Sequence, residues 1–111
     1  MPTTKDFLVA TFNLENLDDS ASLWPTRREV LRPMLLRLNA DLLFLQEVNT
    51  LSALDDLVQG TPYSDYDRAY TTKRDGTPYA VRNLVTLSRY RIENKKQYLH
   101  DLVQAPMWRM A

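Results

Sequence analysis

Glu47 is the residue of this chain whose type and position most suggest chemistry. It closes a largely apolar run, Asp41–Val48, directly after Gln46. Such a run is typical of a strand buried on both faces of a mostly parallel sheet, and ligands collect just beyond the carboxyl ends of such strands. Because a buried carboxylate needs a cation or hydrogen bonds, Glu47 is a candidate metal ligand or acid/base. The alternative is a structural role, in which Glu47 caps a turn or meets an arginine.

Asn13 occupies a similar position, after an expected first strand at residues 7–12. A helical pattern separates this strand from the run before Glu47. The order strand, helix, strand makes the two strands parallel through a right-handed crossover. Asn13 and Glu47 should therefore emerge at the same edge of one sheet, where an amide and a carboxylate could act together.

Strand alternation adds a prediction about the faces of these two strands, because successive side chains point to opposite sides. Two sets of residues are each expected to share a face: Val9, Thr11 and Asn13 on the first strand, and Leu43, Leu45 and Glu47 on the second. If these two faces coincide, the amide and the carboxylate point at one spot.

Composition excludes several kinds of site. The length of 111 residues suits one domain. The 14 basic residues balance 14 acidic ones, so the chain lacks the excess of positive charge that is typical of nonspecific nucleic-acid binding. The chain has no cysteine, which removes disulfides and thiolate sites, and its single His100 excludes a multi-histidine metal site within it. The sequence contains no signal-peptide pattern and no apolar stretch that could span a membrane, so the expected location is cytoplasmic.

The elements that would position these residues can be read from periodicity and turn signals. Thr26 and Glu29 have the spacing of a capping box at the start of a helix that reaches Leu38, with Pro33 expected to kink it. The remaining expected elements are a helix at 51–59 stopped by Gly60, strands near 66–72 and 79–88 around a turn at 73–76, and a further turn and strand at 92–99.

Three segments, in order, resemble the endonuclease/exonuclease/phosphatase superfamily. They are residues 11–17 (TFNLENL), 40–48 (ADLLFLQEV) and 83–92 (NLVTLSRYRI). The resemblance covers about residues 7–92, and it implies the fold class: α/β, the first half of a four-layer α/β sandwich, with one mixed sheet and flanking helices. Residues 1–111 would then be the N-terminal part of a single domain of this family.

The resemblance also implies roles for particular residues. Asn13 and Glu47 would hold a catalytic divalent cation, usually Mg²⁺, with Mn²⁺ as the alternative, and oxygen ligands of this kind suit Mg²⁺. In the third segment, Asn83 or Arg89 could approach a substrate phosphate. The segment departs from the family pattern at Arg91, where proline is usual, and a purely structural role for Arg89 at the end of a core strand is equally open.

Other motifs of the family have no counterpart in the sequence. The Asp-x-Asn pair, the late Asp and the Ser-Asp-His that complete the family's site are missing, and His100 with Asp101 is expected on a surface turn instead. The apolar last residues, 104–111, and an exposed sheet face are expected to form an interface. The chain therefore resembles half an enzyme.

Two functions follow as hypotheses. The first is a Mg²⁺-dependent phosphoesterase, of nuclease or phosphatase type, to which this chain supplies part of the metal site while being inactive alone. Its partners would be a phosphate-ester substrate, with nucleic acid among the candidates, and the missing C-terminal half or a second copy. The alternative is a noncatalytic α/β domain that binds a partner through its sheet face and apolar tail.

Overall fold

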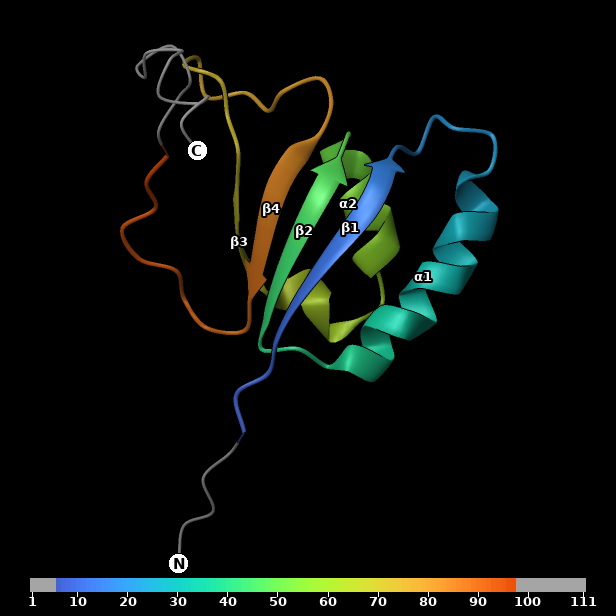
Figure 1. Ribbon diagram of the computed structural model, residues 1–111, viewed down its shortest axis with the longest axis horizontal. Helices are drawn as coiled ribbons and strands as arrows, with labels where there is room; N and C mark the ends of the chain where they lie inside the picture. The colour runs from blue at the N-terminus through green and yellow to red at the C-terminus, as the bar shows by residue number, and fades with distance from the viewer. Residues whose placement is uncertain (1–5, 98–111) are drawn as a thin grey trace, which may run out of the picture.

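The computed structural model describes residues 6–97, which fold around one four-stranded sheet (Figure 1). The strands are β1 (Val9–Leu17), β2 (Leu42–Val48), β3 (Asp67–Tyr70) and β4 (Asn83–Ser88), in the spatial order β1-β2-β4-β3. Two α-helices, α1 (Trp24–Leu38) and α2 (Leu51–Val58), lie on one face of this sheet, and a short 3₁₀ helix, η1 (Pro62–Asp65), precedes β3.

The expected strand–helix–strand unit is confirmed. β1 pairs in parallel with β2, from Val9 opposite Leu42 to Asn13 opposite Gln46. β4 then runs antiparallel to both β2 and β3, so the sheet is mixed. This arrangement is the predicted α/β class, and it brings the carboxyl ends of β1 and β2 to one edge together with the start of β4.

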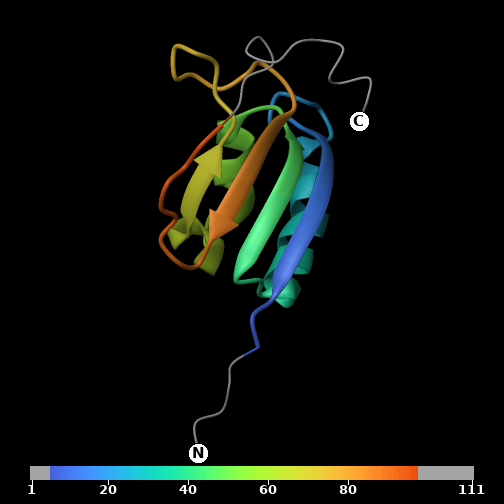
Figure 2. The ribbon, with the colours of Figure 1, turned by 60° about the vertical axis from the view of Figure 1, so that its left-hand side comes forward.

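The core lies between the sheet and the two helices. Leu43 and Leu45 of β2, Leu35 of α1 and Leu54 of α2 are all buried there. The opposite face of the sheet carries exposed apolar side chains, among them Phe44 and Leu84, and no described helix covers it (Figure 2). Among residues 6–97, no helix has the length and apolarity needed to cross a membrane.

Helix α1 begins earlier than predicted. Its first residue is Trp24, preceded by Leu23 with no side-chain cap, so Thr26 lies inside the first turn and the expected capping box does not form. Pro25 explains the shift, because proline at the first helical positions has a φ angle already suited to a helix. The helix continues through Pro33 to Leu38, as predicted.

The strand boundaries also differ from the prediction. β1 continues past residue 12 to Leu17, because Leu14 and Leu17 both enter the core. β4 begins only at Asn83, which leaves residues 71–82 as a loop, and residues 91–97 contain no strand. Residues 98–111, which include His100, Asp101 and the apolar tail, lie outside the described part of the chain.

Candidate functional site

A bulge at the end of β2 determines where Glu47 points. Opposite β4, Leu45 pairs with Val85 but Val48 pairs with Asn83, so β2 has one extra residue between these pairs. Glu47 has a φ angle of 60°, in the left-handed region that non-glycine residues rarely adopt. Simple alternation would place Glu47 on the buried face with Leu45. The bulge instead leaves the Glu47 side chain half-exposed, and this part of the alternation prediction is wrong.

The bulge brings Glu47 to Asn13. The Asn13 side-chain amide donates from Nδ2 to Oε2 of Glu47 over 2.7 Å. Asn13 Oδ1 in turn accepts the backbone N–H of Glu15 at 2.8 Å, which fixes the orientation of the amide. Two of the four predicted site residues therefore lie in direct contact, and among residues 6–97 Glu47 Oε1 accepts no hydrogen bond.

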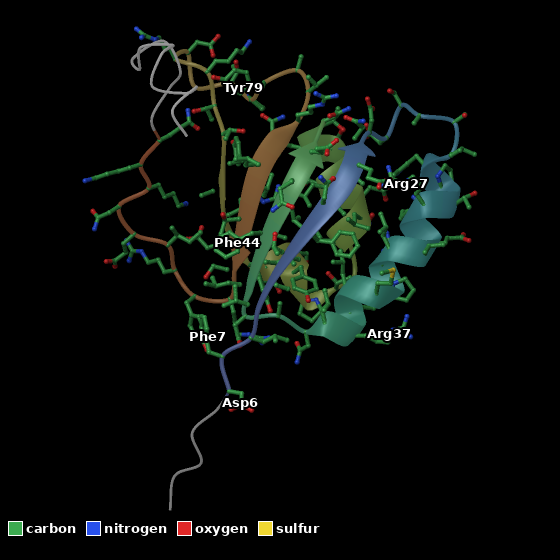
Figure 3. The ribbon with its side chains drawn as sticks, viewed as in Figure 1. Asp6, Phe7, Arg27, Arg37, Phe44 and Tyr79 are labelled. Carbon is green, nitrogen blue, oxygen red and sulfur yellow. The ribbon has the colours of Figure 1, made fainter. Side chains whose placement is uncertain are left out.

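The end of β1 is held in shape by Arg27 of α1. Between the pairs Asn13–Gln46 and Leu17–Val48, β1 contains two more residues than β2, and Glu15 and Asn16 both have positive φ. The Arg27 guanidinium donates to the carbonyl of Glu15 at 3.1 Å and also to the carbonyl of Leu14. Arg27, labelled in Figure 3, thus fixes the chain directly after Asn13.

Asn49 joins three segments at this edge of the sheet. Its backbone N–H donates to the Leu17 carbonyl at 2.8 Å, and its Oδ1 accepts the backbone N–H of Arg82 at 2.8 Å. Nearby, Asp18 Oδ1 accepts the N–H and the hydroxyl of Ser20, and these hydrogen bonds are the chief cause of the lowered pKa of the Asp18 carboxyl. The strand ends that carry Asn13 and Glu47 are therefore linked to the loop before β4.

Asn83 lies at the same edge, but its side chain makes all its hydrogen bonds within the protein. Its side chain is fully buried. Nδ2 donates to the carbonyls of Val48 (3.0 Å) and Tyr79 (2.9 Å), while Oδ1 accepts from the Tyr79 N–H (2.9 Å) and from the Thr71 hydroxyl (3.2 Å). An amide with four such bonds holds the 71–82 loop on the sheet, and it has no exposed surface for a substrate.

Arg89 lies at the other end of the sheet. It follows Ser88, which pairs with Leu42 at the start of β2, whereas Glu47 is near the end of β2. Its guanidinium forms an ion pair with the buried Asp41 at 2.8 Å, and its carbon lies 5.4 Å from the centre of the Tyr66 ring. The structure thus separates Arg89 from Asn13 and Glu47 by the length of β2.

The groups available for a metal ion are few. Within residues 6–97 no cluster of three or more His, Cys, Asp or Glu side chains is suited to hold one. The oxygen atoms of Glu47 and Asn13 make up the candidate site. Sequence reasoning missed Arg27, Asn49 and Arg82, and the only available signal was the position of Asn49, two residues after Glu47.

Comparison with known proteins agrees with this arrangement. A family model described as the endonuclease/exonuclease/phosphatase family matches residues 10–106. The chain belongs to this family. The solved structure of a mannosyl-6-phosphatase from Bacteroides thetaiotaomicron is similar to it, with 25% sequence identity and a TM-score of 0.56. The similarity covers 76% of this chain but 32% of the phosphatase, so the chain spans about a third of that protein. No match was found among curated proteins.

Family membership confirms the resemblance found in the sequence. It also agrees with the mixed sheet and two helices as the N-terminal portion of the family's fold. The matched residues 10–106 include the bulge at Glu47, the amide of Asn13 and the 71–82 loop.

Proposed function

We propose that this chain is part of a divalent-metal-dependent phosphoesterase, in which Glu47 and Asn13 hold Mg²⁺ or Mn²⁺. The observation that supports this most is the 2.7 Å hydrogen bond between the Asn13 amide and a Glu47 carboxylate that sits in left-handed backbone. Backbone conformations of this kind cost energy and cluster at active sites, where the surrounding structure maintains them. A carboxylate needed only for solubility would not require such a bulge.

The residues present fit a hard cation. Mg²⁺ prefers oxygen ligands and commonly takes one or two protein carboxylates, with waters and substrate phosphate completing its shell. Glu47 offers Oε1 and Asn13 offers the remaining lone pair of Oδ1, while the Asn13 amide N–H also orients Glu47 through Oε2. When bound, such a metal polarises a phosphoryl oxygen and stabilises charge on the leaving oxygen.

We further propose that this chain supplies only part of the site. Among the described residues no cluster of three or more His, Cys, Asp or Glu side chains could complete the proposed site, and the match covers only 32% of the similar phosphatase. That similar protein is a mannosyl-6-phosphatase, which favours a phosphomonoester substrate over nucleic acid. We expect the isolated chain to bind metal weakly and to hydrolyse phosphate esters little or not at all.

Metal binding by the full chain tests this proposal. Titration with Mn²⁺, followed by the loss of its free-ion EPR signal, should give an affinity that falls about tenfold or more in Glu47→Gln. Glu93→Gln is the matched control, because Glu93 is an exposed carboxylate beyond β4 and should leave the affinity unchanged. Equal Mn²⁺ affinity in Glu47→Gln and wild type would refute the site.

A second candidate function rests on the uncovered face of the sheet. Val9, Phe44 and Leu84 expose 50%, 38% and 54% of their surface there, and exposed apolar groups of this size favour an interface. In this alternative the chain is a noncatalytic domain that binds a partner or a second copy of itself. Sedimentation of the full chain with Phe44→Glu or Leu84→Glu tests it, and a monomer unaffected by either change argues against self-association.

A further inference from the structure

The loop at residues 71–82 differs in charge from the chain as a whole. It contains three cations, Lys73, Arg74 and Arg82, and one carboxylate, Asp75, whereas the whole chain has a net charge of zero. The loop ends at Asn83, which pairs with Val48, the residue after Glu47. Positive charge is thus placed at the edge of the sheet that carries the proposed metal ligand.

The loop is built to hold a fixed shape. Lys73 and Thr77 are joined by a backbone hydrogen bond of 2.8 Å, and the turn between them closes at Gly76, with a φ angle of 86°. Asp75 accepts the N–H and the hydroxyl of Thr77. The end of the loop that joins β4 is held by the buried side-chain amide of Asn83, which bonds Tyr79 and Val48. Figure 3 shows Tyr79 on this loop, at the same end of the sheet as Arg27 and away from Arg37.

Arg82 is the cation of this loop that directly precedes Asn83, the residue paired with Val48 beside Glu47. Its backbone N–H is bound by Asn49, two residues beyond Glu47. Two residues of chain span at most about 7 Å, a distance that an extended arginine side chain can cover. Arg82 also has a φ angle of 57°, a conformation in which glycine would be favoured, so the backbone there is held at an energetic cost.

The guanidinium of Arg82 is not used by the fold. The side chains of Arg27, Arg32 and Arg89 donate to carbonyls or carboxylates of neighbouring segments. Arg82 is exposed, and within residues 6–97 its side chain makes no hydrogen bond or ion pair. Its backbone is fixed on both sides, by Asn49 and by the buried Asn83, while its charged end is left for another partner.

We propose that Arg82 binds the phosphate group of the substrate beside the Glu47 site. The planar guanidinium offers paired N–H donors that match phosphate oxygens, and a rigid backbone reduces the entropy lost on binding. Arg82 is then a substrate-binding residue, and Asn49 is the residue that positions it. This role rests on the proposed phosphoesterase function, but it requires no metal for phosphate contact.

Nuclear magnetic resonance of the full chain tests this directly. With ¹⁵N-labelled protein in metal-free buffer, inorganic phosphate is added at constant ionic strength and the arginine side-chain Nε–H signals are followed. The Arg82 signal, assigned by its loss in Arg82→Lys, should shift and saturate. The Arg37 signal should not, because Arg37 is an exposed arginine at the opposite end of the sheet. Phosphate affinity should fall about tenfold in Arg82→Ala and not in Arg37→Ala.

The outcomes separate this proposal from the metal site. Glu47→Gln should lose Mn²⁺ binding but keep the phosphate-induced shift at Arg82. If Arg82 shifts no more than Arg37, or if sulfate and chloride give the same shift as phosphate, Arg82 is not a phosphate-binding residue, whatever the metal titration shows. Arg82→Gly should be at least as stable to urea as wild type while losing the shift. A loss of stability together with the shift would assign Arg82 a structural role instead.

Discussion

The Asn13 amide donates to Oε2 of Glu47 across 2.7 Å, which joins two residues 34 positions apart in the chain. The contact exists because β1 and β2 are parallel neighbours and because the Glu47 bulge turns its side chain away from the core. An exposed amide on one strand and a carboxylate on the next therefore act as a single unit. The first two predictions concern this unit.

Replacement of Asn13 separates an orienting role from a charge role. Asn13→Ala removes the hydrogen bond to Glu47, and we expect Mn²⁺ affinity to fall about tenfold, the usual effect of losing a partner that orients a ligand. Asn13→Asp places a second carboxylate beside Glu47 and should keep or raise the affinity. Calorimetric titration with Mn²⁺ checks both variants, and wild-type affinity in Asn13→Ala would show that the contact is irrelevant to metal.

The backbone at Glu47 predicts a difference between two substitutions that both remove the carboxylate. Glu47→Ala keeps a side chain at a φ angle of 60°, whereas Glu47→Gly relieves that conformation. Glu47→Gly should therefore be more stable than Glu47→Ala by about 1 kcal/mol. Urea unfolding in metal-free buffer measures this. Equal stabilities would mean that the left-handed conformation is lost in the alanine variant.

Arg89 should matter for stability and not for metal binding. Arg89→Met removes the ion-pair partner of Asp41, whose side chain is only 4% exposed, and we expect a loss of about 2–4 kcal/mol in the free energy of unfolding. Arg91→Met is the control, because Arg91 is exposed and makes no hydrogen bond or ion pair among the described residues. A change in Mn²⁺ affinity in a folded Arg89→Met protein would contradict this assignment.

Asn83 should control the order of the 71–82 loop. Asn83→Asp loses the donated hydrogen bonds to the carbonyls of Val48 and Tyr79 and replaces them with repulsion between oxygen atoms. We expect a loss of about 2–3 kcal/mol in stability and faster amide hydrogen exchange at Tyr79. Asn94→Asp, at an exposed position, serves as the comparison. Unchanged exchange in Asn83→Asp would show that the loop is held by other contacts.

The two helices are joined by a carboxylate that should make stability depend on pH. Asp56 accepts hydrogen bonds from the Trp24 indole at 2.7 Å and from Arg28 at 2.8 Å, and these lower the pKa of its carboxyl from the ordinary value of 3.8. A carboxyl with a lowered pKa stabilises the folded state above its unfolded pKa, and this contribution is lost as the pH falls through the folded pKa.

Unfolding by urea should therefore require less denaturant as the pH falls below about 4. The decrease should be smaller in Asp56→Asn, and also in Trp24→Phe, which removes the hydrogen bond that contributes most to the lowered pKa of Asp56. Other carboxyls with lowered pKa, such as Asp67 and Asp75, leave part of the acid effect in place. If Asp56→Asn follows the wild-type curve at every pH, Asp56 makes no such contribution.

Several features were decided by the sequence alone. Hydrophobic periodicity and the crossover rule placed α1 between two parallel strands, because burial and chain handedness leave few other arrangements. The Leu-Gln-Glu ending and the Asn after the first strand led to the right family and to two residues that lie in contact. Local patterns sufficed for these features, because they define the strand ends and the helix, and the crossover rule then brings the ends of two parallel strands to one edge.

Other features depended on tertiary structure. Alternation along β2 assigned Glu47 to the face of Leu45, but pairing with β4 inserts a bulge and reverses that assignment. In the sequence, Asn83 and Arg89 were equal candidates to approach a substrate phosphate. In the folded chain Asn83 is buried and holds the 71–82 loop on the sheet. Arg89 instead forms an ion pair with Asp41 at the opposite end of the sheet. Register shifts and long-range hydrogen bonds are set by contacts between distant segments, so only the folded chain could decide which polar residues remain available for chemistry.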